Sequence, residues 1–518
     1  MSKQTTVYVL ALFVGLSAAT FYFFVPFFPY GADSINYIEQ ARSFMARGVF
    51  ETIPISSNEF ENPAVPDNLF PPGYPLLLII SSKLLFVPIE IIAPWLSLAA
   101  LVLLPIGIVF SFQRIVGLWA AFWIAILVTL TPTMVFFGSI AYSDSLSLLV
   151  VVFAVNRLLV IDNKASSWFY LGLLTGFSYL LRNANIALLI SIFLYSFWSL
   201  ISEPKNRKAK IVHIGFWALG NAVFIVPMFI YNVLIFGKIQ PYSMPPSTVG
   251  LSQNIHDYIF SQLNTLLVFS DLDRLFNNVF GIIVLISALI VLSYKAITTW
   301  QQWQKIDQQT FLISITYTAI GAAITIVART KYQWGVHIEP RYALPYACFI
   351  FVALVIIFKY ALVKINTRYL IGLAVILLSF RMYDLGKDYQ RRQNNLYDIA
   401  VVNTATQMRT HPDNICTDLN GRVALSNLHY VYRIVCAAPV RELGAFDYHK
   451  LNESLTKWAV LGAKKGIVVS LFPIGKQKND LPLTQETVNK LSSSGWQVER
   501  NDTENLLLSR KANTSDEL

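Results

Sequence analysis

Charge is scarce in this sequence: Lys, Arg, Asp and Glu make up 14% of its 518 residues, whereas hydrophobic residues make up 55%. A soluble globular domain usually carries about 25% charged residues, so this composition excludes a wholly soluble protein. The first apolar block lacks a small-residue cleavage site before Pro26, which argues against a cleaved signal peptide. The sequence also has no internal repeat of the kind that builds many transporters.

Long apolar blocks fill the first three quarters of the chain. Many of them approach the roughly 17 to 25 residues that are needed to cross a bilayer core. The candidate blocks are residues 7–28, 91–112, 117–137, 146–160, 168–181, 186–200, 211–236, 279–294, 311–327, 342–358 and 369–380. The sequence therefore predicts a polytopic α-helical membrane protein with about 11 spanning helices, the first of them an uncleaved anchor.

Lysine and arginine predict the orientation of these helices, because basic residues concentrate in cytoplasmic loops. With the N-terminus in the cytoplasm, the basic cluster at 205–210 also faces the cytoplasm. The first outer loop then carries six acidic residues against two arginines between Pro29 and Pro72. An odd number of crossings places the C-terminus outside a plasma or inner membrane.

The segment Phe70–Phe86, FPPGYPLLLIISSKLLF, is apolar enough to cross the membrane but does not fit this topology. A crossing here would invert every later loop and place the basic cluster outside. We therefore expect an interfacial helix on the outer leaflet, with a short true crossing as the alternative. The first outer loop, residues 29–90, then contains two interfacial helices, and the earlier one begins near Asp33 with its apolar face on the membrane.

The net charge of +10 does not indicate a nucleic-acid partner. Residues 1–381 hold 23 basic and 15 acidic residues, whereas residues 382–518 hold 17 and 15. The excess therefore lies mostly at cytoplasmic helix ends, where it suits topology and contact with anionic membrane lipids.

Hydropathy falls and charge rises near Met382, which predicts a membrane domain over 1–381 and a soluble extracytoplasmic domain over 382–518. Short β-like runs alternate there with helical stretches, which is typical of a small α/β domain. The expected strands are 414–417, 430–436, 466–471, 496–500 and 506–509, and the expected helices are 384–409, 450–463 and 484–493. The domain has no phosphate loop, nucleophile elbow or metal-ligand spacing.

The sequence has three cysteines. Cys416 and Cys436 end two of the expected strands in the extracytoplasmic domain, where disulfides are permitted. A bridge between them is a reasonable expectation. Cys348 lies in a membrane helix, where we expect it only to pack.

Polar groups near hydrocarbon are expensive, so those that remain need an explanation. Four places stand out at the outer ends of the predicted helices. Two are acidic: Asp33, followed at helical spacing by Tyr37, and Asp144. The alternative for each acid is a helix N-cap, which is common and stabilising. The other two are basic: Arg182, for which the alternative is loop solvation, and the turn 329–341.

The turn 329–341 concentrates charge between two apolar helices. Its charged and titratable residues are Arg329, Lys331, His337, Glu339 and Arg341. Because this concentration breaks the positive-inside trend, topology alone does not explain it. Basic groups at a membrane surface suit a phosphate, and a nearby carboxylate can take a proton from an acceptor hydroxyl or amine. A sugar linked to a lipid phosphate presents such a leaving group at this depth.

This order of features resembles the GT-C glycosyltransferases, integral-membrane enzymes that use polyprenyl-phosphate sugars. The matching positions are Asp33 in the first loop, Pro71 and Pro72 at the second interfacial helix, Asp144, Arg182 after Gly172 and Gly176, and Arg341 and Tyr342 in an Arg-Tyr-x-x-Pro motif. They occur in the family's order within residues 1–381. The resemblance implies Asp33 and Asp144 as catalytic residues. With the basic turn, it predicts a donor-phosphate and substrate site of Arg182, Arg329, Lys331, Glu339, Arg341, Tyr342 and Tyr37.

Two positions depart from the family pattern. Ser34 stands where the second acid of an Asp-Glu pair is usual, and Phe70 stands where many members have Lys or His. A divalent metal therefore has no clear ligand set, and no cofactor is assigned.

We therefore predict an inverting glycosyltransferase at the outer face of the membrane. It would move a sugar from a polyprenyl-phosphate donor to a lipid, glycan or protein acceptor. The alternative is a transporter or lipid flippase without catalysis. The absence of repeats and the position of the polar residues at helix ends favour the enzyme. A scaffold with an outside binding domain is a third interpretation.

Overall fold

The chain divides into two compact units, each of which combines several stretches of sequence. Unit 1 comprises Met1–Phe21, Asn68–Leu77 and Pro94–Asp388, and unit 2 comprises Tyr22–Asp67, Leu78–Ala93 and Tyr389–Leu518. The structure is a computed structural model that describes residues 2–53, 64–162, 164–202, 207–242, 244–267, 294, 297–333, 338–361, 367–410, 423–426, 428–436, 440–442, 467–471, 485–493, 495–501 and 506–510. The predicted domain boundary at Met382 falls inside one continuous helix, Thr367–Gln393, and it stays a prediction.

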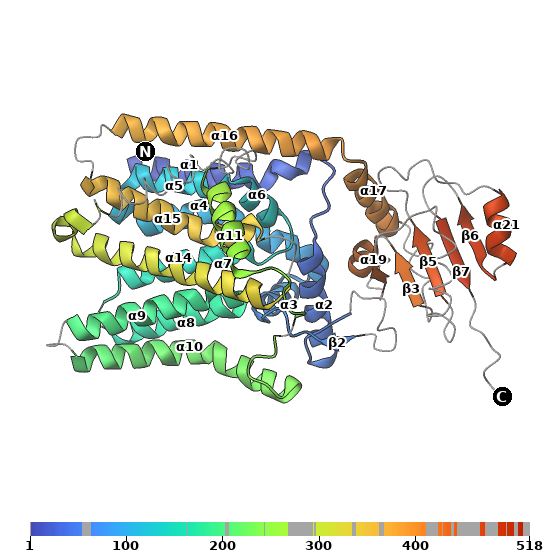
Figure 1. Ribbon diagram of the computed structural model, residues 1–518, viewed down its shortest axis with the longest axis horizontal. Helices are drawn as coiled ribbons and strands as arrows, with labels where there is room; N and C mark the ends of the chain where they lie inside the picture. The colour runs from blue at the N-terminus through green and yellow to red at the C-terminus, as the bar shows by residue number, and fades with distance from the viewer. Residues whose placement is uncertain are drawn as a thin grey trace. The chain divides into compact units, whose positions relative to one another are not determined.

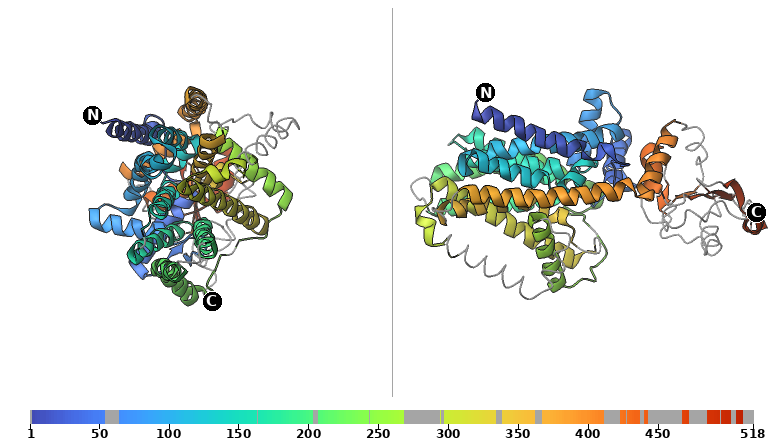
Figure 2. Two further views of the ribbon diagram at one scale, coloured as in Figure 1. Left: turned by 90° about the vertical axis from the view of Figure 1, so that its left-hand side faces the viewer. Right: turned by 90° about the horizontal axis from the view of Figure 1, so that it is seen from above.

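Most helices of unit 1 are long and apolar and run side by side (Figures 1 and 2). Its helices are α1 (Lys3–Thr20), α5 (Leu118–Thr129), α6 (Pro132–Ser139), α7 (Asp144–Leu159), α8 (Ala165–Leu181), α9 (Ile186–Ser202), α10 (Arg207–Phe236), α11 (Leu251–Leu267), α14 (Lys305–Lys331) and α15 (Pro340–Ala361). Three further helices begin in one unit and end in the other: α3 (Gly73–Leu85), α4 (Ile89–Val116) and α16 (Thr367–Gln393).

Six helical stretches among the described residues are long and apolar enough to cross a bilayer, and a seventh forms if α5 and α6 count as one bent span. Helices α7 and α8, with 16 and 17 residues, are too short to be counted among these six stretches. The expected block at 279–294 lies outside the described residues except for Tyr294. The total of about 11 spans therefore stays a prediction.

A sharp bend of 65° separates α5 from α6. Pro132 is the first residue of α6, and a proline disfavours helical backbone in the residue before it. Thr131 is accordingly extended, with ψ at 130°, and its hydroxyl donates to the carbonyl of Leu127 at 2.8 Å. The bend lets α6 end at Ser139, only five residues before α7 begins at Asp144.

Glycines allow α8 and α10 to touch along their backbones. A Cβ atom on Gly172 of α8 would lie 2.2 Å from the carbonyl oxygen of Trp217, and one on Gly220 of α10 would lie 2.2 Å from the carbonyl oxygen of Phe169. Small residues at helix interfaces are typical of membrane bundles, where close backbone packing stabilises association. The contact fixes α8, whose C-terminal end carries Arg182.

The expected interfacial segment Phe70–Phe86 forms the helix α3. Its 13 residues span roughly 20 Å at 1.5 Å per residue, which is shorter than a bilayer core of about 30 Å. The helix itself is confirmed, and its position on the outer leaflet stays a prediction.

Unit 2 contains a five-stranded mixed sheet in the order β4-β3-β5-β7-β6, drawn in orange to red in Figure 1. Strand β3 pairs in parallel with β4 and β5, whereas β7 pairs antiparallel with β5 and β6. The strands are β3 (Val423–Ser426), β4 (Arg441–Glu442), β5 (Ile467–Leu471), β6 (Gln497–Asn501) and β7 (Leu506–Arg510). The unit also contains α2 (Ala32–Arg47), the short pair β1 (Glu51–Thr52) and β2 (Val65–Pro66), α17 (Leu396–Thr410), α19 (His429–Val435) and α21 (Gln485–Ser493).

The expected strands at 466–471, 496–500 and 506–509 and the helix at 484–493 are confirmed to within a residue. The strand expected at 430–436 is wrong, because this stretch is the helix α19. Val431 and Tyr432 of this helix, together with Leu428 at its N-cap, belong to a buried hydrophobic core. The elements expected at 414–417 and 450–463 lie outside the described residues.

The single helix expected at 384–409 is also wrong, because two helices share this stretch. Helix α16 continues to Gln393 and α17 begins at Leu396, with Asn394 and Asn395 between them. Asparagine side chains compete with the helical backbone and favour caps. Here the Asn395 amide donates to the Asp398 carboxylate at 3.2 Å, in the first turn of α17.

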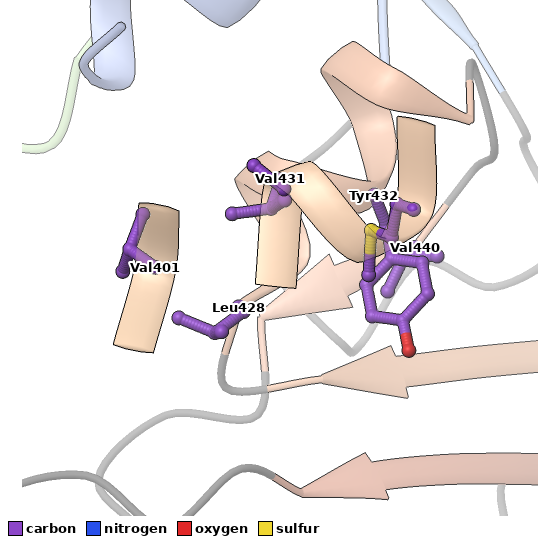
Figure 3. Close-up of a cluster of buried hydrophobic side chains, with 7 residues drawn as sticks. Val401, Leu428, Val431, Tyr432 and Val440 are labelled. Carbon is purple, nitrogen blue, oxygen red and sulfur yellow. The ribbon is translucent and has the colours of Figure 1, made fainter. Parts of the chain in front are cut away.

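Helices α17 and α19 pack around a small hydrophobic core in unit 2. The buried residues of this core are Val401, Ala405, Met408, Leu428, Val431, Tyr432 and Val440 (Figure 3). Phe28, from the segment that precedes α2, and Leu507 of β7 pack against it. The core therefore joins the start of the chain to its C-terminal segment.

Cys436 is disulfide-bonded, whereas Cys348 is buried with a free thiol, as expected for a packing residue. Cys416, the expected partner of Cys436, lies outside the described residues, so the predicted pairing stays a prediction.

Candidate functional site

Asp144 and Arg182, predicted separately from the sequence, form one buried ion pair in unit 1. Asp144 is the first residue of α7, and Arg182 follows the last residue of α8. A guanidinium nitrogen, Nη1, of Arg182 donates to Oδ1 of Asp144. The side chains are only 13% and 5% exposed, respectively. The partial positive charge at the start of a helix stabilises a carboxylate in the first turn, so α7 stabilises the charged form of Asp144. The Asp144 carboxylate in turn holds the guanidinium of Arg182 in place.

The turn after Arg182 is fixed by a buried polar network. The amide of Asn185 donates to Oγ of Ser147 at 2.7 Å and to the carbonyl of Ser178 at 2.8 Å. Tyr317 of α14 is completely buried, and its ring lies 5.0 Å from that of Tyr346 of α15. Its hydroxyl lies 3.5 Å from Oδ1 of Asn185. The sequence did not single out these two tyrosines, because a tyrosine in an apolar helix cannot be distinguished from a packing residue by the hydropathy pattern alone.

The segment Pro71–Pro72 and the start of α3 lie close to the end of α8, which precedes Arg182. A Cβ atom on Gly73, the residue after Pro72, would lie 2.4 Å from the carbonyl oxygen of Leu180, close to Arg182. The Tyr74 hydroxyl hydrogen-bonds Oγ of Ser97 at 2.8 Å, and that Oγ donates to the carbonyl of Tyr142 at 2.7 Å. The start of α3, the end of α8 and the approach to Asp144 are thus connected within unit 1.

Arg341 sits in an aromatic cage at the start of α15. Its guanidinium carbon lies 5.3 Å from the ring centroids of Phe137 and Tyr142 and 4.9 Å from that of Tyr342. Its Nη2 donates to the Tyr342 hydroxyl at 3.3 Å, and its Nε lies 3.8 Å from Oε2 of Glu339. Arginine stacked on aromatic faces is oriented as well as held. Tyr142 links this cage to Asp144, two residues further along the chain.

Arg329 and Lys331 lie at the end of α14, against the loop that precedes α11. Arg329 is fully buried and donates to Oγ of Ser247 at 3.0 Å. Lys331 is exposed, with Nζ 5.1 Å from the centroid of the Tyr332 ring. The turn is described only in part, because residues 334–337, and His337 with them, lie outside the described residues. The grouping of its basic side chains into one cluster therefore stays a prediction.

Asp33 and Tyr37 belong to α2 in unit 2. The N-cap of α2 is Gly31, whose amide donates to Oγ of Ser34 at 2.9 Å, so the alternative of Asp33 as N-cap is wrong. Asp33 lies in the first turn and is half-buried. Tyr37 is 4% exposed and Ala41 is fully buried within the protein, so the expectation that this face lies on the membrane is also wrong.

Tyr30 precedes α2 and anchors it. Burial raises the pKa of Tyr30 to about 12, so the phenol stays protonated at neutral pH. Its hydroxyl donates to the carbonyl of Glu90, the residue whose carboxylate accepts a hydrogen bond from Arg42 of α2. The entry to the helix that carries Asp33 is therefore tied to the start of α4.

The described residues contain no group of three or more His, Cys, Asp or Glu side chains that could hold a metal ion. The arrangement in unit 1 is instead one of arginines oriented by a carboxylate and by aromatic rings. Such groups bind and stabilise an anion such as a phosphate.

The structure of this chain is similar to those of several solved membrane enzymes. It matches ArnT from Cupriavidus metallidurans bound to undecaprenyl phosphate, with a TM-score of 0.57, 12% identity and coverage of 98% of this chain and 97% of that chain. It also matches the arabinofuranosyltransferase AftD from Mycobacteria, with a TM-score of 0.51, 12% identity and coverage of 100% and 40%. The apo oligosaccharyltransferase from Archaeoglobus fulgidus gives a TM-score of 0.50, 12% identity and coverage of 90% and 69%.

No family model and no curated protein matches the sequence itself. The three fold neighbours are glycosyltransferases of the GT-C superfamily, so the resemblance seen in the sequence is confirmed at the level of the fold. With its apolar spans, the chain is an integral membrane protein that has the GT-C fold.

Proposed function

We propose that this chain is an inverting glycosyltransferase that moves a sugar from a polyprenyl-phosphate donor to an acceptor at the outer face of the membrane. The acceptor is a lipid, a glycan or a protein. The observation that carries the proposal is the buried Asp144–Arg182 pair beside the caged Arg341, at the ends of apolar helices. The GT-C fold, found in a structure bound to undecaprenyl phosphate, supports a lipid-linked donor.

In the proposed reaction, Asp33 is the general base. An acceptor oxygen or nitrogen attacks the anomeric carbon of the sugar and gives its proton to the Asp33 carboxylate. The bond between the anomeric carbon and the phosphate oxygen breaks, and the polyprenyl phosphate leaves with the electron pair. A single displacement of this kind inverts the configuration at the anomeric carbon.

The basic groups of unit 1 receive the departing phosphate in this proposal. Arg182 and Arg341 bind its oxygens, and Arg329 and Lys331 add positive charge at the same face of the membrane. Tyr37 lies one helical turn from Asp33 and contacts the acceptor or the sugar, while Tyr342 and Glu339 orient Arg341. Because Asp144 already neutralises Arg182, we assign it the task of orienting that arginine.

The proposed topology follows from the basic residues. The N-terminus lies in the cytoplasm, and the α/β domain of residues 382–518 lies outside, as the positive-inside rule requires. The helix α3 then rests on the outer leaflet, beside the lipid headgroups where the donor phosphate is found.

The test compares Asp33→Asn with the wild-type protein in proteoliposomes that contain undecaprenyl-phosphate-linked or dolichyl-phosphate-linked sugars. Mass spectrometry measures the release of free polyprenyl phosphate and the sugar on added acceptors. We expect the wild-type protein to release polyprenyl phosphate. In Asp33→Asn we expect the transfer rate to fall by a factor on the order of 10²–10⁴, because asparagine cannot accept a proton at neutral pH.

The matched control is Asp162→Asn, in the loop between α7 and α8, which we expect to keep the wild-type rate. Transfer by Asp33→Asn at the wild-type rate would overturn the assignment of the base. Transport of the intact lipid-linked sugar across the membrane, without release of polyprenyl phosphate, would favour the flippase instead.

A further inference from the structure

The C-terminal segment, residues 389–518, contacts the helix that carries Asp33. Within unit 2, α19 of this segment packs against α2, although the two helices are almost 400 residues apart in the sequence. The function proposed above gives this segment no task. The contacts between α19 and α2 are charged, reciprocal and at least partly buried, which is more than packing requires.

The first contact is a two-pronged ion pair between Glu39 of α2 and Arg433 of α19. Nε of Arg433 donates to Oε1 of Glu39 at 2.6 Å, and Nη2 donates to Oε2. The Arg433 side chain is completely buried, and that of Glu39 is 11% exposed. Ile53 closes the group, since its carbonyl accepts from Nη2 of Arg433 at 2.7 Å and its amide donates to Oε2 of Glu39 at 2.9 Å. A bidentate pair fixes direction as well as distance.

The second contact runs in the opposite sense, from Arg42 of α2 to the end of α19. Nη1 of Arg42 donates to the carbonyl of Arg433 at 3.0 Å, and Nη2 donates to the carbonyl of Ile434 at 3.0 Å. The last carbonyls of a helix lack intrahelical donors and carry partial negative charge, so a guanidinium satisfies both needs. Nη2 also donates to the Glu90 carboxylate at 2.9 Å, which neutralises Arg42.

These attachments lie away from the side of α2 that carries Asp33. With 3.6 residues per turn, Glu39 and Arg42 lie about 120° and 180° around the helix from Asp33. Helix α19 is itself fixed by the hydrophobic core of unit 2, to which Val431 and Tyr432 belong (Figure 3). The C-terminal segment can therefore set the position of α2 without covering the carboxylate of Asp33 by these contacts.

We propose that the C-terminal segment positions the catalytic base, with Glu39, Arg42 and Arg433 as positioning residues. This inference rests on the proposed function of Asp33. It assigns the segment a structural task in catalysis in place of binding a substrate of its own. Misplacement of a reacting group by about 1 Å can lower a rate about 10²-fold, so a loosened α2 affects turnover rather than donor binding.

The experiment measures kcat and KM for a lipid-linked donor in the full-length Glu39→Gln and Arg433→Lys proteins. We expect kcat to fall about 10²-fold in Glu39→Gln and less in Arg433→Lys, with the donor KM within about twofold of the wild type. The control is Arg47→Gln, which removes an exposed arginine–glutamate pair at the end of the same helix and which we expect to leave kcat unchanged. In an Asp33→Asn background, the further change Glu39→Gln is expected to alter the residual rate by less than about twofold, because Glu39 acts through Asp33.

Hydrogen exchange separates this inference from the proposed function, since it needs no substrate. We expect the amides of α2 to exchange faster in Glu39→Gln and in the double variant Glu39→Gln/Arg433→Met, which has no unpaired buried charge, while α14 stays unchanged. Unchanged exchange in α2, or a raised KM with a normal kcat, would overturn the positioning role. Absence of transfer by the wild type would overturn the proposed function and the catalytic task together, and exchange in α2 would still decide whether α19 holds the helix.

Discussion

At the scale of single residues, the Asp144–Arg182 pair makes a direct prediction about stability. Removing one partner of a buried pair leaves an uncompensated charge, which typically costs about 3–5 kcal/mol. We expect Asp144→Asn to lower the free energy of unfolding by that amount in thermal denaturation of the detergent-solubilised protein. The Arg182 side chain is only 13% exposed, so water replaces little of the lost interaction.

The comparison variant for this prediction is Arg47→Gln, which breaks an ion pair whose arginine is 56% exposed. Exposed pairs contribute about 0–1 kcal/mol, so this variant should denature close to the wild type. Equal losses in the two variants would mean that the Asp144 carboxylate does not carry the charge that holds Arg182.

The sequence identified both residues of this pair but not the pair itself. Asp144 and Arg182 stand out because charged groups in apolar helices are expensive. The two residues are 38 positions apart, and the sequence between them contains no signal that the end of α8 returns to the start of α7. Tyr317 and Tyr346 carried no signal at all, since a hydroxyl on an apolar ring does not disturb an apolar pattern.

At the scale of the elements, the glycines between α8 and α10 define how closely these helices approach. We expect Gly172→Ala to lower the free energy of unfolding by about 1–3 kcal/mol, because the added methyl group meets backbone atoms that cannot rotate away. Thermal denaturation in detergent measures the change. Since Arg182 directly follows α8, donor binding should weaken as well.

Gly215 lies on α10, the helix that packs against α8. It provides the control, because a Cβ atom there meets nothing within 4 Å. Alanine is the better helix former, so Gly215→Ala should raise stability by about 0.5–1 kcal/mol. A destabilised Gly215→Ala together with a neutral Gly172→Ala would show that the two helices are not packed in this way.

Long helices and the strands β5, β6 and β7 could be predicted from the sequence, whereas α19 and β3 could not. The block at 311–327 and the helix α14 agree because a long apolar run admits few other structures. The sequence of the seven residues of α19 is equally compatible with a strand. Packing against α17 in the hydrophobic core favours the helix. The strand β3 was missed, because four residues give no period to recognise.

At the scale of the whole molecule, orientation in the membrane is the first testable property. We expect a membrane-impermeant maleimide, added from outside, to label a cysteine placed at exposed Ser492 of α21. A cysteine placed at Asn206, in the basic loop, should be labelled only after the membrane is opened. The basic residues around that loop are the physical reason, because they are retained on the cytoplasmic side.

Native Cys348 does not complicate this measurement, because its thiol is buried. Labelling of the Asn206 probe from outside would contradict the proposed topology. It would also place α3 across the membrane, since one added crossing inverts every later loop.

The GT-C fold could be predicted from five short motifs in order, but the division into two units could not. Unit 2 draws residues from the segment that follows α1, from the junction of α3 with α4 and from the C-terminal segment. Composition marks the C-terminal segment as soluble near Met382. Nothing in the composition indicates that Arg433 is buried against Glu39, because a charged residue is recognised as buried only when its partner in the fold is known.

The distance along the chain between Glu39 and Arg433 also has a consequence in time. The two residues are 394 positions apart, and ribosomes add roughly 5–20 residues per second, so Arg433 is made about 20–80 s after Glu39. Throughout that interval the membrane helices can insert and pack while α2 lacks its buried partner. Under the function and the positioning role proposed above, a nascent chain acquires the arginines assigned to the donor before its base is fixed. We therefore expect turnover only in chains whose synthesis has passed α19.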